Sequence, residues 1–479
     1  MKRRHDSFCA PSSFFFKKEH QHNKKVNDAL LLWVKSHSRI IIAVEVHIIP
    51  HDTMRFGCSE GLTRLTKFLP TLLLTTSTFA FPIAEITTRR GAIQRTATSV
   101  TTLATSMSSS KTQSNDSINW GIVGLGDVCQ KKAGPPFWKC NGSELVAVMR
   151  RTPGKAEEFA AKNVPGGKCV GYQDIEEFLQ HPGLDAVYVS TRPGTHLEIC
   201  RKVARAGKAC YVEKPVGRCA DETREILGCF RESGMPLYTA YISRAYEKTQ
   251  AIKKLMEEGA IGDRVSKVLY KVIGNGGARD MDGDLPWRLD AEQSGGGLIM
   301  DVGCHVIDRI DYLCGPLQNI KGEAANRNSP GVAVEDYVHF TADIGAASWT
   351  VLSNNEGATV ECTWDFASSE SPYDELQFIG PKGSLRMKGS PSDPINVHDA
   401  NGEFVRQLDF EMPEHTGQAL VQGVTDDLRG GNTRDFLSFG ENAIRTQTVL
   451  DTVLSSYYGG REQGYWTRMD TWPGRSENE

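Results

Sequence analysis

The chain has 479 residues, and its 55 lysines and arginines nearly balance its 59 aspartates and glutamates, so a formal net charge of −4 offers no basic surplus for nucleic acid or an anionic membrane. A hydrophobic content of 39% supports a sizeable core, the length suggests about two to three domains, and no apolar run reaches the roughly 18–20 residues of a membrane span. The 12 cysteines are scattered and include no CxxC pair, which favours free thiols in a reducing compartment and predicts neither a disulfide framework nor a metal site.

Residues 1–117 predict a targeting or disordered extension rather than a folded domain. From Met54 a basic stretch leads into FLPTLLLTTSTFA (68–80), an apolar run that ends in small residues, as in a secretory signal. The sequence that follows is rich in Ser, Thr and Arg and poor in acids, as in a transit peptide. Together they resemble the bipartite plastid presequence of algae with secondary plastids. Two alternatives stay open: a polar tail without a targeting role, and a cytoplasmic protein translated from Met107 instead of Met1 or Met54.

Residues 118–243 alternate short apolar runs with amphipathic stretches. This alternation predicts a doubly wound parallel sheet with helices on both faces, as in nucleotide-binding Rossmann domains. The expected strands are INWGIV before the first glycine turn, ELVAVMR (144–150), DAVYVST (185–191), KACYVEKP (208–215) and PLYTAY (236–241), and the helices between them include GKAEEFAAKN (154–163) and THLEICRKVARAG (195–207).

A Gly-x-Gly turn follows the first of these strands. Gly124 and Gly126 would let the backbone approach a pyrophosphate, with Asp127 and Val128 lining the turn and the next helix N-terminus facing the phosphates. The third small position of the pattern is Cys129, which is small enough for helix–strand packing. The sequence therefore predicts a dinucleotide site at this turn.

The second strand ends in Arg150 and Arg151, about 20 residues past the glycine turn, where an acidic residue binds the ribose 2′-hydroxyl of NAD. A carboxylate there repels a 2′-phosphate, whereas an arginine attracts it and binds it in a bidentate geometry. The two arginines, assisted by Thr152 and Lys155, predict NADP as the cofactor. The alternative is a pair of solvated surface cations.

An ordered set of motifs extends along the rest of the chain. It runs from Gly121 through STRPGTH (190–196), YVEKP (211–215), AYISR (240–244), GAIGD (259–263), PWRLDAEQSGGG (286–297) and DVGCHVIDRIDYLCG (301–315) to FIGPKGSLRM (378–387). Together these motifs resemble the Gfo/Idh/MocA oxidoreductases, a family that includes glucose–fructose oxidoreductase and inositol dehydrogenase. The departures are Cys129 at the third glycine position and Arg192 where the family often has proline.

Lys214 stands at the carboxyl end of a predicted parallel strand, where open α/β sheets bind ligands, and it can hydrogen-bond a substrate oxygen. If 298–314 is helical, Asp301 and His305 lie one turn apart, so that Asp301 can orient His305 for proton transfer. From spacing alone, the commoner interpretations are a solvent-exposed lysine and a structural histidine whose hydrogen bonds are made by a nearby acid. The resemblance implies that Lys214 and His305 are catalytic, with Asp301 as the partner of His305, and that Glu213 and Lys214 lie beside the nicotinamide.

Further site residues are expected around the same strand ends. Those expected near the nicotinamide or over the cofactor are Thr191, Arg192, His196 and Arg288. Those expected to face the substrate are Tyr241 and Arg244.

Residues 244–470 predict an α/β substrate and oligomerisation domain with a large, mostly antiparallel sheet covered by helices on one face. The expected strands are RVSKVLYKVIG (264–274), EDYVHFTADI (335–344), ASWTVLSNN (347–355) and TVECTWDFA (359–367), followed by a hairpin of DELQFIG and SLRMKG. The resemblance implies that the open face of this sheet forms a dimer. The Gly-rich stretch 274–284 predicts either a mobile lid or a plain surface loop.

These expectations combine into an NADP-dependent oxidoreductase that transfers a hydride between the nicotinamide and a CH–OH or C=O carbon of a sugar, polyol or diol. One alternative is a non-catalytic NADP-binding sensor on the same fold, which would not need Lys214, Asp301 and His305 together. The other is a reductase of a non-sugar carbonyl or a tetrapyrrole-like substrate.

Overall fold

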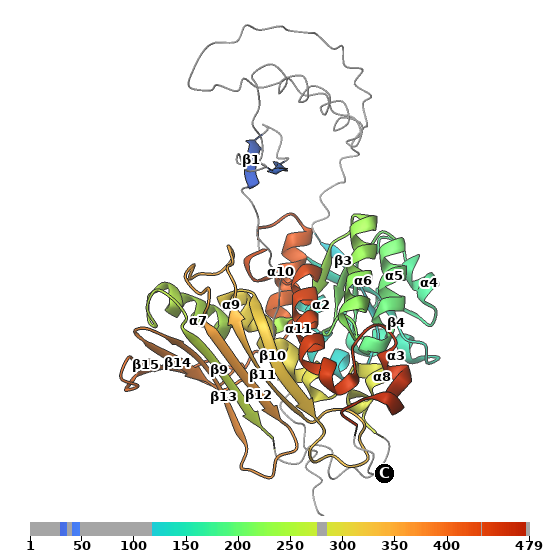
Figure 1. Cartoon of the computed structure of the whole chain (residues 1–479). Coiled ribbons are helices and arrows are strands. Elements are labelled where there is room, and N and C mark those ends of the chain that lie inside the picture. Colours follow the sequence, from blue (N-terminus) through green and yellow to red (C-terminus); the bar gives the residue numbers. More distant parts are fainter. Residues whose placement is uncertain (1–28, 36–40, 48–116, 275–284, 433, 476–479) are drawn as a thin grey trace, which may run out of the picture. The chain divides into compact units, whose positions relative to one another are not determined.

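The computed structural model describes residues 29–35, 41–47, 117–274, 285–432 and 434–475 (Figure 1). Two described segments precede the main body: β1 (Ala29–Lys35) and β2 (Ile41–His47) pair as an antiparallel hairpin, which the sequence did not predict. The predicted targeting sequence between Met54 and residue 116 lies outside the described residues, and so does the predicted lid at 275–284. Within the described ranges, no helix is both long and apolar enough to cross a membrane.

The first large sheet is six-stranded and parallel, with the strand order β5-β4-β3-β6-β7-β8 (Figure 1). Its strands are β3 (Ile118–Val123), β4 (Ser143–Met149), β5 (Val170–Tyr172), β6 (Ala186–Val189), β7 (Ala209–Val212) and β8 (Leu237–Thr239). Alternate residues of β6 pack into two separate core clusters, Val187 in one and Tyr188 in the other, because both faces of the sheet are covered. The strand order is that of a Rossmann domain, which confirms this part of the predicted fold class.

The helices of this domain follow the predicted alternation except after the glycine turn. They include α3 (Lys155–Asn163), α4 (Ile175–Leu179), α5 (His196–Arg205) and α6 (Ala220–Ser233). After the glycine turn the chain forms only a π-helical segment, η2 (Cys129–Ala133), and then α2 (Pro136–Lys139). The predicted helix N-terminus facing the phosphates is therefore reduced to a short segment, because Pro135 and Pro136 cannot continue it.

The second large sheet is eight-stranded, with the order β10-β11-β12-β9-β13-β14-β15-β16. Neighbours are antiparallel, except that β12 and β9 run parallel, so the predicted mostly antiparallel sheet is confirmed. Its strands are β9 (Lys267–Ile273), β10 (Leu317–Ala325), β11 (Tyr337–Ile344), β12 (Thr359–Asp365), β13 (Tyr373–Gly380), β14 (Gly383–Met387), β15 (Ile395–Asp399) and β16 (Phe404–Leu408).

The sequence placed one strand of this sheet wrongly and missed three others. Residues 347–355, predicted as a strand, form a loop tied to the helix beside it. The indole N–H of Trp349 donates to the carbonyl of Asp311 at 3.0 Å, and the amide of Asn355 donates to the carbonyl of Cys314 at 3.1 Å. The missed strands β10 and β16 carry polar or exposed residues at most positions, so they lack the alternation that identifies a half-buried strand; β15 does alternate, with Ile395 and Val397 buried, and was missed despite that signal.

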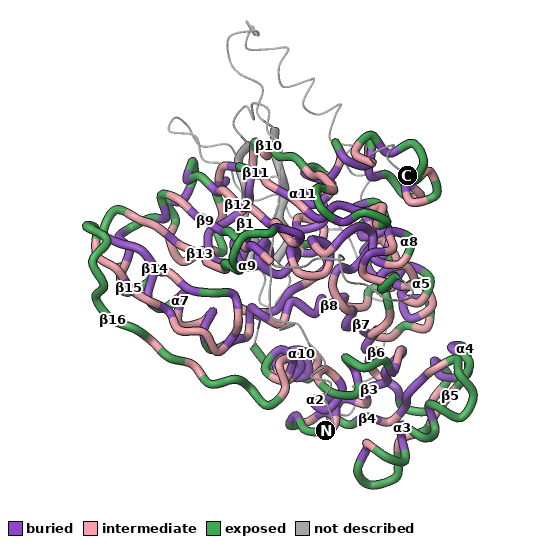
Figure 2. The backbone as a smooth tube through the Cα atoms, turned by 90° about the horizontal axis from the view of Figure 1, so that it is seen from below, coloured by how far each residue is buried: buried purple, intermediate pink, exposed green. Residues whose placement is uncertain are grey.

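Three helices between residues 304 and 458 cover the two sheets. α9 (Cys304–Cys314) and α11 (Gly440–Tyr458) lie against the second sheet, and Figure 2 shows them largely buried. α10 (Gln418–Leu428) instead packs on the first sheet, where Trp120 of β3 donates from its indole nitrogen to the hydroxyl of Thr425 at 3.3 Å. Residues from the end of the chain therefore complete the core of the nucleotide-binding domain.

Candidate active site

A cleft of about 900 Å³ lies at the carboxyl ends of β3, β4, β6 and β7, and residues from the segment 287–305 and from the start of α10 line its other side. The predicted site residues that line this cleft are Gly124, Gly126, Asp127, Val128, Arg150, Arg151, Thr191, Arg192, Glu213, Lys214, Arg288, Asp301 and His305. His196, Tyr241 and Arg244 are not among its lining residues. The structure therefore gathers residues from two domains into one site.

The glycine turn has the geometry that a dinucleotide needs. Gly124 has φ of 96°, and a side chain there would meet the carbonyl oxygen of Ser190 at 2.8 Å. A Cβ on Gly126 would meet no atom within 4 Å and would project into space beside the cleft that a pyrophosphate could fill. Cys129 at the third position is buried, as helix–strand packing requires. The residues of this turn therefore fit a dinucleotide cofactor.

Arg150 and Arg151 follow β4 at the same edge of the sheet. Arg150 donates from Nη1 to the carbonyl oxygen of Leu125 at 2.9 Å, which holds its guanidinium beside the glycine turn. Arg151 is exposed on the cleft wall. Lys155, the predicted helper, is not a lining residue and instead pairs with Glu158 at 2.7 Å. The cleft edge at β4 is thus cationic, and among the described residues it has arginines at positions 150 and 151, where the sequence pattern for NAD expects a carboxylate.

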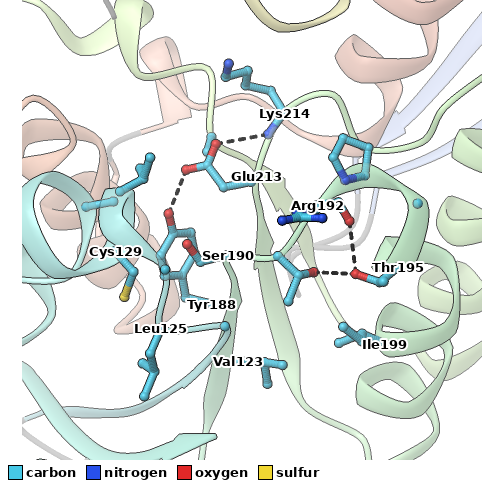
Figure 3. A pocket seen from close by; sticks show the side chains of 18 of the residues that line it. Val123, Leu125, Cys129, Tyr188, Ser190, Arg192, Thr195, Ile199, Glu213 and Lys214 are labelled. Atoms are coloured by element: carbon cyan, nitrogen blue, oxygen red, sulfur yellow. Dashed lines mark hydrogen bonds between the residues drawn. The ribbon is translucent and has the colours of Figure 1, made fainter. Parts of the chain in front are cut away.

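Glu213 and Lys214 emerge from the end of β7 (Figure 3). The Glu213 carboxylate accepts hydrogen bonds from the hydroxyl of Tyr188 at 2.6 Å and from the backbone N–H of Lys214 at 3.3 Å. Burial raises the pKa of Glu213 above its usual value, although the charge of Lys214 and these hydrogen bonds act in the opposite direction. Its carboxylate is therefore fixed in position at the floor of the cleft.

The side chain of Lys214 is held by Asp301 from the other domain. Its ammonium donates to the Asp301 carboxylate at 2.5 Å and to the Asp301 carbonyl at 2.8 Å. The second carboxylate oxygen of Asp301 accepts from Nε of Arg288 at 2.5 Å. Burial would lower the pKa of Lys214, but the charge and hydrogen bond of Asp301, together with the charges of Cys304 and Glu213, raise it. Burial would likewise raise the pKa of Asp301, but the two cations hold it below its usual value. Both groups are therefore charged at neutral pH.

His305 lies in the cleft at the start of α9. Its Nδ1 atom is buried and has no hydrogen-bond partner within the described part of the chain. Burial and the positive charge of Lys214 lower the pKa of His305 well below 6.5, against the opposing effect of Asp301. The imidazole is therefore neutral at physiological pH and able to accept a proton.

The sequence predicts that Asp301 orients His305, but the hydrogen bonds of the Asp301 carboxylate go to Lys214 and Arg288. Asp301 belongs to a π-helical segment, η6 (Ile299–Gly303), and the α-helix begins only at Cys304. A π-helix closes its hydrogen bonds over five residues instead of four, so residues four apart across this junction do not follow the α-helical stripe that the prediction assumed. The Asp301 carboxylate is directed to Lys214 and Arg288 instead.

Arg192 reaches from the end of β6 to the segment that carries Arg288. Its guanidinium donates to the side-chain oxygen of Gln293 and lies 5.8 Å from the ring centroid of Trp287. Arg288 contacts the same ring, with its guanidinium carbon 4.4 Å from the centroid. The two arginines thus flank one tryptophan beside the Lys214–Asp301 pair.

Three predicted site residues lie behind the cleft. His196 is fully buried, and its ring nitrogens lie 3.1–3.2 Å from the carbonyl oxygens of Thr191, Pro215 and Val216, so it fastens the loops that follow β6 and β7. Tyr241 is buried with its ring edge-on to His305, centroid to centroid 6.1 Å.

Arg244 is the third of these residues. It is buried in η4 (Ile242–Ala245) and forms a bidentate ion pair with Asp308 of α9, at 2.7 Å from Nε and 2.5 Å from Nη2. The expectation that Arg244 faces the substrate is not met, because its guanidinium is used to hold the helix that bears His305.

Sequence reasoning missed several residues that line the cleft. Tyr188 lines the cleft, but the sequence pattern indicated only that it belongs to a buried strand. Its hydroxyl, the polar side-chain group within AVYV, was the signal that could have identified it. Gln293 and Arg218 carried no signal of their own, because their partners are set by the fold. Arg218 pairs with Glu222 at 2.5 Å and donates to the carbonyl of Glu292 at 2.7 Å, which ties the two walls of the cleft together.

The comparison with known proteins agrees with this site. Residues 118–241 match the model described as "Oxidoreductase family, NAD-binding Rossmann fold", and residues 249–386 match the "GFO/IDH/MocA C-terminal domain". The chain is 30% identical over 305 residues to "Oxidoreductase P35" of Formosa agariphila, which covers 64% of this chain and 89% of that protein. It is 27% identical over 303 residues to 1,5-anhydro-D-fructose reductase of Ensifer adhaerens, covering 60% of this chain and 83% of the relative.

A solved structure shares the fold. Aldose-aldose oxidoreductase from Caulobacter crescentus superimposes with a TM-score of 0.59 at 22% identity, over 70% of this chain and 96% of that one. Both family domains are present in order, and the glycine turn, the Glu213–Lys214 strand end and the helix of His305 meet in one cleft. The chain belongs to the Gfo/Idh/MocA family of oxidoreductases, whose first domain binds a nicotinamide cofactor.

Proposed function

We propose that this protein is an NADP-dependent oxidoreductase that transfers a hydride between the nicotinamide and a CH–OH or C=O carbon of a sugar, polyol or diol. The observation that carries the proposal is the meeting of Lys214, Asp301 and His305 in the cleft that also contains the glycine turn. The reductase and oxidoreductase names of its sugar-acting relatives support the substrate class.

Two arginines support NADP over NAD. In either cofactor the bound nicotinamide supplies the hydride acceptor or donor, so the two arginines bear only on the choice between NADP and NAD. A guanidinium has five N–H donors. Arg150 uses one of them in the hydrogen bond to the Leu125 carbonyl, so several donors remain for a 2′-phosphate. Arg151 on the same wall adds a second positive charge. This edge would stabilise the phosphate of NADP and offers no carboxylate for the ribose hydroxyl of NAD.

Lys214 is suited to bind the oxygen of the reacting carbon. An ammonium group has three N–H donors, and Asp301 accepts two hydrogen bonds from it. The third donor is left for a substrate oxygen in the cleft. Because Lys214 stays protonated, it stabilises the negative charge that develops on that oxygen as its proton leaves.

His305 is suited to move that proton. Its neutral imidazole accepts the hydroxyl proton in the direction of oxidation, and the imidazolium so formed returns that proton to the oxygen in the direction of reduction. Asp301 acts through Lys214 and Arg288, because its carboxylate is hydrogen-bonded to both of them.

The test is the substitution His305→Ala. We expect turnover with NADP and a sugar or polyol panel to fall by about 10²–10⁴-fold, while NADPH binding measured by fluorescence is retained. His398→Gln is the matched control, since His398 lies on β15 and is not a cleft residue. Full activity of the His305→Ala variant would end the proposed mechanism.

A further inference from the structure

Three cations, Lys214, Arg288 and Arg192, gather at the substrate end of the cleft. Lys214 and Arg288 share the single carboxylate of Asp301. Glu213, another carboxylate of the cleft, accepts its hydrogen bonds from a tyrosine hydroxyl and a backbone amide. Arg192 stands beside them with no carboxylate partner within the described residues, since its guanidinium is hydrogen-bonded to the neutral side chain of Gln293.

Arg192 is nevertheless held in place. The Gln293 contact and the Trp287 ring, 5.8 Å away, fix the guanidinium against the domain that carries Asp301 and His305. Its side chain is exposed and lines the cleft. Lys202, another cation that lines the cleft, is by contrast already paired, since it lies 3.1 Å from Glu176 and 3.6 Å from Glu198. An exposed guanidinium that is ordered by a neutral partner keeps donors for an anion.

The position of Arg192 points away from the cofactor phosphates. In the strand order, β4 with Arg150 and β6 with Arg192 are separated by β3, so the two arginines stand about 10 Å apart at the sheet edge. Arg192 contacts the segment of Trp287 and Gln293, which belongs to the domain opposite the glycine turn. The sequence had placed Arg192 at the nicotinamide; its contacts favour the substrate.

We propose that Arg192, held by Gln293 and Trp287, binds the carboxylate of the substrate, so that the enzyme acts on a sugar acid rather than on a neutral sugar. This inference rests on the proposed function. One cation without a carboxylate partner matches a single negative charge, which favours a carboxylate over the doubly charged group of a sugar phosphate. Its planar fork is the geometry that binds a carboxylate in two parallel hydrogen bonds.

The test is calorimetric binding to the full chain carrying His305→Ala, with and without NADP, so that no turnover disturbs the titration. The probes are D-glucuronate against D-glucose, D-galacturonate against D-galactose, and glucose 6-phosphate. We expect an acid to bind at least about tenfold more tightly than its neutral partner, and more tightly than the phosphate. Arg192→Gln should remove that difference, Arg192→Lys should keep part of it, and the control Arg224→Gln, at an exposed arginine outside the cleft, should leave it unchanged.

The outcomes separate this inference from the proposed function. If NADPH binds but the neutral sugar or the phosphate binds as tightly as the acid, or if no acid binds, the substrate class is overturned while the oxidoreductase assignment stands. An acid preference that persists in Arg192→Gln overturns the role of Arg192. If NADPH does not bind, the proposed function fails, and the cofactor-free titration still shows whether Arg192 selects the acid.

Discussion

The charges of Lys214 and Asp301 shift each other's pKa and that of His305, and this sets the pH range of the site. Asp301 raises the pKa of Lys214 against burial, so the ammonium charge is present below the usual lysine pKa of 10.5 and lost only above it. The pKa of Asp301 is lowered, so its charge is present above its usual value of 3.8 and lost only at lower pH. The pKa of His305 is lowered below 6.5, so the neutral base persists under acid conditions as well. The ion pair and the neutral base therefore coexist across the neutral range.

The first prediction concerns Asp301→Asn. Removing the carboxylate leaves Lys214 with burial, which lowers its pKa, and without the charge that raises it. We expect the basic limb of the kcat/KM profile, above pH 10 in the natural protein, to move to lower pH in Asp301→Asn. A profile of the same shape in both proteins would contradict the role given to Asp301. Glu361→Gln, which removes a carboxylate paired with Lys267 on the second sheet, is the control.

At the scale of single residues, the sequence predicted which side chains form the candidate site. It could not predict which of these side chains are hydrogen-bonded to each other. Lys214, Asp301 and His305 were all identified from strand-end position, helix spacing and resemblance, and all three line the cleft. The contact between Lys214 and Asp301 joins residues 87 positions apart. No local periodicity encodes such a contact, and the one local rule that was applied, α-helical spacing, failed at a π-helical segment.

The elements that carry the site are held together by buried charges. Helix α9, which bears His305, is fixed to η4 by the pair of Arg244 with Asp308, whose side chains are 4% and 0% exposed. Removing one partner of a buried pair leaves an uncompensated charge, whereas replacing both by apolar residues does not. The elements with continuous apolar runs, such as β6 and β7, were predicted correctly. Those with polar or irregular patterns, such as β16 and the loop of Trp349, were not.

The second prediction follows from this pair. Arg244→Met should lower the free energy of unfolding by roughly 3–5 kcal/mol, and the double variant Arg244→Met/Asp308→Leu should recover much of the loss. The measurement is the chemical denaturation midpoint of each variant. Arg224→Met, which breaks an exposed pair with Asp221, is the control and should leave the midpoint nearly unchanged. A single variant no less stable than the control would show that the buried pair does not anchor α9.

The whole chain consists of a predicted targeting region followed by two domains, each with one large sheet, that share one cleft. α10 returns to the first sheet after the second has been completed, so the nucleotide-binding domain needs the C-terminal part of the chain. A sequence pattern shows that α10 is a helix but not which sheet it covers, because both sheets offer an apolar face.

The third prediction concerns delivery. We propose that residues 54–117 direct the protein to a plastid, from their signal-like and transit-like order. Fused to a fluorescent protein in an alga with secondary plastids, this segment should give plastid fluorescence, and a fusion of 107–117 alone should stay in the cytosol. A diffuse cytosolic signal from the longer fusion would leave the cytoplasmic alternative in place.

The central claim is an NADP site formed by the glycine turn and the arginines after β4. The most direct measurement is a fluorescence titration of the full chain with NADPH and with NADH, beside the variant Arg150→Asp. We expect tight NADPH and weak NADH binding in the natural protein, and a loss of NADPH binding, with NADH retained, in the variant. Equal binding of the two cofactors, or a preference that Arg150→Asp does not change, would show that the arginines are surface charges and would contradict the account.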